Sequence, residues 1–224
     1  RRGSADPLDG EESQARPRWR GVLHQWAAVY ALGVASALVA LAPDDRTRLA
    51  CALYGASLAT LFGVSALYHR VTWRPRARAW LRRADHAAIY LLIGGTYAPV
   101  ALLALEPGTR RSLLGAIGIG VVVAVLAALL WPRAPKWVGA ATAVALGWTV
   151  VPFLPAITRA LGTLELWLFV AGGLAYTAGA VVYATRRPDP RPASFGYHEV
   201  FHALTLVGAA LHLWAILAIV RAHA

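Results

Sequence analysis

Seven long apolar segments separated by short polar connections constrain this chain more than any other feature of its sequence. Each has about 20 residues, the length that an α-helix needs to cross the hydrocarbon core of a bilayer. Because 58% of the 224 residues are hydrophobic and only 15% are charged, one water-soluble core is excluded. We therefore predict an all-α, seven-helix transmembrane bundle in the cell membrane. The predicted segments are residues 22–42, 48–69, 86–105, 112–131, 137–155, 164–184 and 198–220.

The polar residues that precede the first segment form a region of different composition. Residues 1–20 contain Pro, Gly, Ser and charges of both signs but few apolar residues, which is typical of a flexible tail. We predict two regions, a flexible cytoplasmic tail over 1–20 and a transmembrane domain over 21–224.

The basic residues are distributed unequally between the connections on alternate sides of the predicted membrane. One side carries 16 Lys and Arg residues and the other carries 6. The positive-inside rule then predicts a cytoplasmic N-terminus and an exoplasmic C-terminus. Because membrane orientation explains the net charge of +11, we predict no nucleic-acid partner.

The unusual polar residues fall at one end of the predicted bundle. With seven spans, the end of the second, the start of the third and the start of the seventh must lie on the same side of the membrane. Ser65 and His69 end the second segment, Asp85 precedes the third, and His198 and His202 begin the seventh. Ionisable groups between transmembrane helices usually face a cavity or one another, so this grouping predicts a site.

The histidine spacing predicts a metal centre. Residues four apart share one face of a helix, so His202 should lie about 6 Å deeper than His198, and both can face His69. Three neutral imidazoles leave the fourth position of a tetrahedral zinc ion open for water, which is the catalytic pattern rather than the structural one. Asp85 would hold that water. Imidazole also suits iron and other metals.

Each residue also has a simpler interpretation. Asp85 at a helix start would cap the helix, and Ser65 alone would be a packing residue. The six arginines between residues 70 and 84 could attract anionic lipid headgroups, but topology explains them. A lone histidine near the membrane surface is usually hydrogen-bonded and half-hydrated rather than a ligand. The histidines interpreted in this way are His24, His86, His212 and His223.

Three stretches that contain these residues carry a family resemblance. They are SALYH at 65–69, DHAAIYLLIGGTYAP at 85–99 and FGYHEVFHALTLVGAALH at 195–212. They resemble, in order, the Ser-x3-His, Asp and His-x3-His elements of the bacterial hemolysin III proteins. Those proteins are related to the progestin and adipoQ receptors and, more distantly, to the alkaline ceramidases.

The resemblance implies a zinc ion near the cytoplasmic face, bound at His69, His198 and His202. Asp85 and Ser65 would lie beside the zinc-bound water. By likeness to the ceramidases, it implies zinc-dependent hydrolysis of an amide bond in a membrane lipid, in the inner membrane of a bacterium. Glu199 follows the first histidine of His-Glu-x-x-His, but related receptors need no acidic residue there, so we leave it outside the catalytic set.

Three other functions compete with a lipid hydrolase. In a receptor-like or membrane-homeostasis protein, the same zinc would be structural and would hold the second, third and seventh spans together. A haemolytic pore former is disfavoured because a chain with seven apolar helices does not travel readily through water. An intramembrane zinc protease fits poorly because the 22 residues after His202 leave little room for a downstream carboxylate ligand. The extended metzincin motif also fails, because Gly208 stands where its third histidine is needed.

Overall fold

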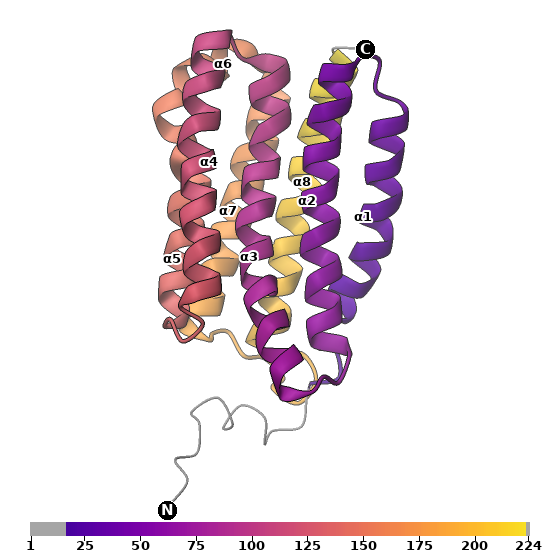
Figure 1. The fold of residues 1–224 in the computed structure, drawn as a ribbon, viewed down its shortest axis with the longest axis vertical. Helices are drawn as coiled ribbons and strands as arrows, with labels where there is room; N and C mark the ends of the chain where they lie inside the picture. The colour runs from indigo at the N-terminus through magenta and orange to yellow at the C-terminus, as the bar shows by residue number, and fades with distance from the viewer. Residues whose placement is uncertain (1–16, 223–224) are drawn as a thin grey trace, which may run out of the picture.

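The computed structural model describes residues 17–222, and in that range the chain is a bundle of long helices without a β-strand (Figure 1). The structure contains seven helical segments long and apolar enough to cross a membrane, which confirms the predicted fold class. The elements are α1 (Val22–Ala40), α2 (Asp45–Arg70), α3 (Pro75–Pro99), the π-helical turn η2 (Val100–Ala104), α4 (Pro107–Leu130), α5 (Lys136–Gly147), the 3-10 turn η3 (Trp148–Phe153), α6 (Leu154–Ala160), α7 (Thr163–Thr185) and α8 (Tyr197–Ala222).

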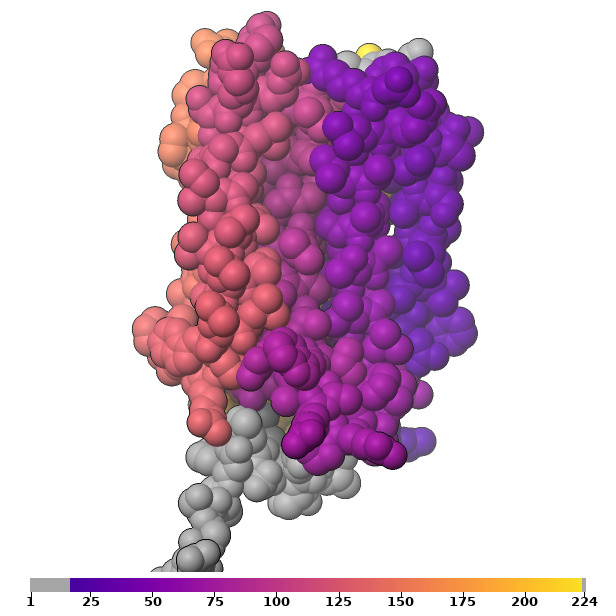
Figure 2. Space-filling view, in the orientation of Figure 1, coloured from indigo at the N-terminus to yellow at the C-terminus, as the bar shows by residue number. Residues whose placement is uncertain are grey.

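The outer surface of the bundle is apolar. Large side chains such as Trp26, Ile119 and Leu130 are 69%, 70% and 79% exposed. A water-soluble monomer rarely exposes extensive apolar surface, whereas hydrocarbon chains solvate it well. Figure 2 shows one such outer face, on which α2, α3 and α4 lie side by side. The protein is therefore an integral, multi-pass membrane protein.

The third helix begins earlier than its apolar pattern predicts. α3 starts at Pro75, a residue favoured in the first turn, and continues through an Arg- and Ala-rich stretch of good helix formers. Asp85 therefore lies ten residues inside the helix. Its predicted alternative role as a helix cap is wrong, because no free backbone N–H groups lie there to be capped.

The fifth span is interrupted within the bundle. α5, η3 and α6 together cover Lys136–Ala160, and Pro152 lies in the 3-10 turn. The Tyr97 hydroxyl donates to the Gly147 carbonyl at 2.6 Å and accepts from the Val150 N–H at 3.1 Å. In a bilayer core, a broken helix needs such internal partners for its backbone.

The end of the bundle at which α2 ends and α3 and α8 begin is called the proximal end below. It is the lower end in Figure 1. α1 packs along α2, α7 packs along α8, and α8 also contacts α1, α3 and η2, so it lies inside the bundle. Residues 17–20, the last part of the predicted tail, lie at this end, where the Trp19 N–H donates to the Ser194 carbonyl at 3.2 Å. The rest of the predicted tail, 1–16, lies outside the described residues.

Candidate metal site

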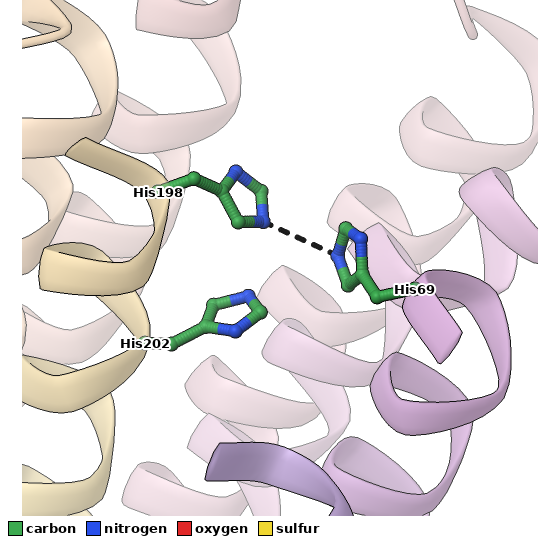
Figure 3. A group of neighbouring side chains, drawn as sticks. All are labelled: His69, His198 and His202. Carbon is green, nitrogen blue, oxygen red and sulfur yellow. Dashed lines mark hydrogen bonds between the residues drawn. The ribbon is translucent and has the colours of Figure 1, made fainter. Parts of the chain in front are cut away.

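Three histidines from two helices meet near the proximal end. His69 comes from the last turn of α2, and His198 and His202 come from the first turns of α8. Their rings point toward one another (Figure 3), and the candidate ligand nitrogens all lie within 4.8 Å of one another. The Nε2 atoms of His69 and His198 are 3.2 Å apart. These three residues are called the triad below.

The spacing of the triad suits a metal ion. Two nitrogens bound to one tetrahedral zinc ion at about 2.05 Å lie about 3.3 Å apart, which is close to the His69 to His198 separation. His69 and His202 are 9% and 2% exposed, so little water competes for their nitrogens. The triad could therefore hold a divalent ion with an open fourth position.

Two further predicted site residues lie against the triad. Asp85 reaches in from α3, and its Oδ2 is 3.7 Å from the His69 Nε2 atom. That distance is too long for a direct hydrogen bond and leaves the carboxylate beside the nitrogen that would face a metal. Ser65 lies one helical turn before His69 on α2 and is buried. The structure therefore brings all five residues predicted from the sequence to one place.

His24 belongs to this group although its sequence context favoured an isolated, half-hydrated side chain. It is 2% exposed, and its Nδ1 atom forms a 2.8 Å hydrogen bond with the Ser65 Oγ atom. Its ring also stacks on His202, with 3.7 Å between centroids and an interplanar angle of 11°. The sequence contains a signal for this position of His24, which lies at the start of the first span. The first span must begin on the same side of the membrane as the third and the seventh.

Glu199, the acidic residue of His-Glu-x-x-His, is fully buried. Both of its carboxylate oxygens accept hydrogen bonds from groups outside the triad. Oε1 accepts from the Arg20 Nε–H at 2.6 Å, and Oε2 accepts from the Gly196 backbone N–H at 2.8 Å. Arg20 precedes Gly21, which has a left-handed φ of 75° and packs directly on His69. The segment before α1 thus touches both helices that carry the triad.

A large cavity opens at the triad and continues into the bundle. Its volume is about 660 Å³. Near the proximal end its lining includes the triad, Asp85 and several basic side chains. Farther along, the lining becomes apolar, with residues such as Ile93, Val150 and Phe169. The cavity is therefore polar at the end where the triad could bind a metal ion and apolar farther inside the bundle.

The other histidines are accounted for differently. His86 bonds to the Arg82 carbonyl at 2.7 Å and lies 3.3 Å from the Tyr183 hydroxyl. His212 donates to the Phe169 carbonyl at 3.1 Å. His223 lies outside the described residues.

Comparison with known families agrees with the resemblance of the three motifs. A family model described as Haemolysin-III related matches residues 13–213. The chain belongs to the haemolysin-III related family. All five predicted site residues, and His24 with them, lie within the matched region of this haemolysin-III related chain.

Curated proteins similar to this haemolysin-III related chain come from bacteria, plants and animals. Hemolysin-3 of Bacillus cereus is 27% identical over 83% of this chain and 77% of its own length. Heptahelical transmembrane protein ADIPOR2 of Oryza sativa subsp. japonica is 34% identical over 70% of this chain and 76% of its own length. Monocyte to macrophage differentiation factor of Homo sapiens is 26% identical over 86% and 79%, respectively. One of these relatives is thus described as heptahelical, in agreement with the seven spans of this chain.

Proposed function

We propose that this chain is a zinc-dependent hydrolase that cleaves an amide bond in a membrane lipid. One observation carries the proposal: the triad and Asp85 line the same cavity, which continues into an apolar interior. A structural metal site is usually closed by four protein ligands, whereas a catalytic site keeps one position open to substrate. The apolar interior would accept an acyl chain, while the carbonyl remains at the triad.

Each polar residue has a role in such a hydrolysis. Zinc bound by the triad would lower the pKa of water toward about 7 and polarise the substrate carbonyl. Asp85 would accept a proton from the attacking water and deliver it to the leaving nitrogen. The C–N bond breaks, a fatty acid takes the water oxygen, and an amine leaves. Ser65, held by His24, would orient the water or the Asp85 carboxylate.

We also propose that the proximal end faces the cytoplasm and that the protein resides in a bacterial inner membrane. The excess of basic residues in the connections on that side, 16 against 6, supports this orientation. A lipid could then reach the cavity from the inner leaflet.

Metal content and turnover test the two parts of this proposal. Elemental analysis of the purified wild type should find about one zinc ion per chain, the number that one three-histidine site holds. His198→Ala and His202→Ala should lose that zinc, whereas the matched control His86→Ala should keep it. Wild-type metal content in both triad variants would eliminate the site.

Fatty-acid release from a panel of ceramides then tests catalysis. Asp85→Asn should keep the metal and lose release, because the amide cannot accept the proton. If fully zinc-loaded wild type releases no fatty acid from any lipid amide, the enzyme proposal fails.

The alternative is a receptor-like or membrane-homeostasis protein in which the metal is structural. One observation favours it: His69 and His198 lie 129 residues apart in the sequence, on α2 and α8. An ion bound by both would hold these two helices together. In that case zinc-loaded wild type would release no fatty acid, and Asp85→Asn would keep the metal and change no reaction.

A further inference from the structure

Basic residues at the proximal end occupy two different places. One group lines the cavity near the triad and consists of Arg20, Arg78, Arg82, Lys136 and Arg186. A second group lies outside the cavity, on the first turns of α3 or just before them, and consists of Arg74, Arg76 and Arg83. In Figure 1 these first turns extend beyond the neighbouring ends of α4 and α5. The second group therefore belongs to the outer surface of the bundle, where it can meet the surrounding lipid headgroups.

The length of α3 places Arg83 at the level of the headgroups. α3 and η2 together form one span of 30 residues, Pro75–Ala104. At 1.5 Å per residue this span is about 45 Å long, about 15 Å more than the hydrocarbon core of a bilayer. Its polar residues lie at the proximal end, because the apolar segment begins at residue 86. The Arg83 Cα atom lies three residues before that point, about 4.5 Å outside the hydrocarbon and within a headgroup layer about 5–7 Å thick.

The Arg83 side chain lies over the ring of Trp80, one helical turn before it. The guanidinium carbon is 4.6 Å from the ring centroid. Trp80 is 61% exposed, so the pair lies on the outer surface of α3. A ring covers one face of a guanidinium and leaves the N–H groups in its plane able to donate. Membrane orientation explains arginines at this end of the bundle, but it does not require a guanidinium held over an exposed ring.

One donor of Arg83 lacks a partner among residues 17–222. Its Nε atom is buried and forms no hydrogen bond there. In the same range no ion pair joins a carboxylate to Arg74, Arg76 or Arg83. The stretch from residue 70 to residue 84 contains six arginines and no Asp or Glu. Because a buried N–H without an acceptor is costly, this arrangement favours an anionic acceptor that is not part of the described chain.

We propose that Arg83 and Trp80 form a binding site for the phosphate of an anionic membrane phospholipid. The paired N–H groups of a guanidinium match two phosphate oxygens, and an exposed tryptophan is favoured at the headgroup level. The positive charges of Arg74 and Arg76 repel the ammonium of a zwitterionic headgroup and favour a headgroup without a cation, such as that of phosphatidylglycerol. Arg83 and Trp80 do not line the cavity, so this site does not depend on the proposed hydrolysis.

A matched pair of lipids tests the proposal. Palmitoyl-oleoyl phosphatidylglycerol and phosphatidylcholine carry the same acyl chains and differ only in the headgroup. Binding to the purified wild type in a neutral detergent, measured by native mass spectrometry, should be about fivefold tighter for phosphatidylglycerol. Equal affinity for the two lipids would overturn the proposal. Inorganic phosphate that binds the wild type as tightly as phosphatidylglycerol does, and that is lost in Arg83→Gln, would reassign the site to free phosphate and overturn the lipid site.

Charge variants separate this site from general surface charge. Arg83→Gln should weaken phosphatidylglycerol binding about fivefold, the scale of one basic side chain at an anionic surface, and leave phosphatidylcholine binding unchanged. Arg76→Gln removes the same charge from the same helix, about 10 Å farther from the hydrocarbon, and its affinity should stay within about twofold of the wild type. Equal losses in these two variants would overturn the proposal.

Further variants test the stacked geometry. Trp80→Ala keeps the charge and removes the ring, so it should weaken phosphatidylglycerol binding about threefold, whereas Trp80→Phe should retain most of the affinity. Arg83→Lys keeps the charge without the paired donors, and its affinity should lie between those of the wild type and Arg83→Gln. Wild-type affinity in both Arg83→Gln and Trp80→Ala would overturn the proposal. Elemental analysis should find the wild-type metal content in all these variants, which separates a failure of this site from a failure of the triad.

Discussion

Replacing Arg20 by Met tests whether the segment before α1 holds the triad in place. The Arg20 and Glu199 side chains are 25% and 1% exposed and form a 2.6 Å ion pair. Removing one partner of a fully buried pair costs about 3–5 kcal/mol because the other charge stays buried without compensation. Since a quarter of the Arg20 side chain is exposed, water replaces part of the interaction, and we expect Arg20→Met to lower the free energy of unfolding by about 2 kcal/mol.

A double-mutant cycle isolates the ion pair. Glu199→Gln keeps an acceptor for the Gly196 N–H and removes the charge, so it should cost about 1 kcal/mol. Because contacting residues are not additive, the double variant should lose about 1.5 kcal/mol less than the sum of the single variants. The assay is reversible unfolding in mixed micelles, followed by circular dichroism, with zinc affinity measured by chelator competition.

The matched control is Arg18→Met, because Arg18 is exposed and lies two residues away. It should leave both unfolding and zinc affinity unchanged. Equal effects of Arg18→Met and Arg20→Met, or strictly additive losses in the cycle, would refute the reasoning.

Three further measurements address the surroundings of the triad. Gly21→Ala would place a Cβ atom 2.6 Å from the His69 Cβ at a φ of 75°, so it should cost about 2 kcal/mol and weaken zinc binding, whereas Gly33→Ala, with open space around it, should do neither. His24→Leu should lower the free energy of unfolding by about 1–2 kcal/mol by leaving the buried Ser65 hydroxyl without this partner, and adding Ser65→Ala should restore most of it; no recovery in the double variant would contradict the contact. Removing bound metal with a chelator should lower the thermal midpoint of the wild type, because a metal that binds only the folded state stabilises it, and an unchanged midpoint would argue against an occupied site.

The fold could be predicted from the sequence because a helix that crosses a bilayer needs about 20 consecutive, mostly apolar residues. Few other structures need such segments, and seven of them follow one another in this chain. The boundaries were less predictable. The Arg-rich residues that open α3 are too polar for an apolar segment, so hydropathy places its start at residue 86, although the helix begins at Pro75. Helix propensity and the proline were the relevant signals there, and they concern the backbone rather than the membrane.

The candidate site could be predicted where residues one helical turn apart share a face, and where the order of the spans places a charged residue at the same end of the bundle, as it does Asp85. His198 and His202 lie one helical turn apart, so their shared face follows from the sequence. His24 has no such neighbour, and its contacts with Ser65 and His202 depend on how α1 packs against α2 and α8. The cavity-facing position of Lys136 depends likewise on the relative placement of α5 and α8, which no periodicity encodes.

The separation of the triad along the chain has a consequence for biosynthesis. His69 lies in the second span and is made long before His198, which follows it by 129 residues in the last. During synthesis the bundle therefore holds only one of the three triad imidazoles until α8 has been inserted and packed. A ribosome-stalled chain that ends before residue 198 would offer metal only that single nitrogen donor from the triad, so loading of the ion would report that assembly is complete.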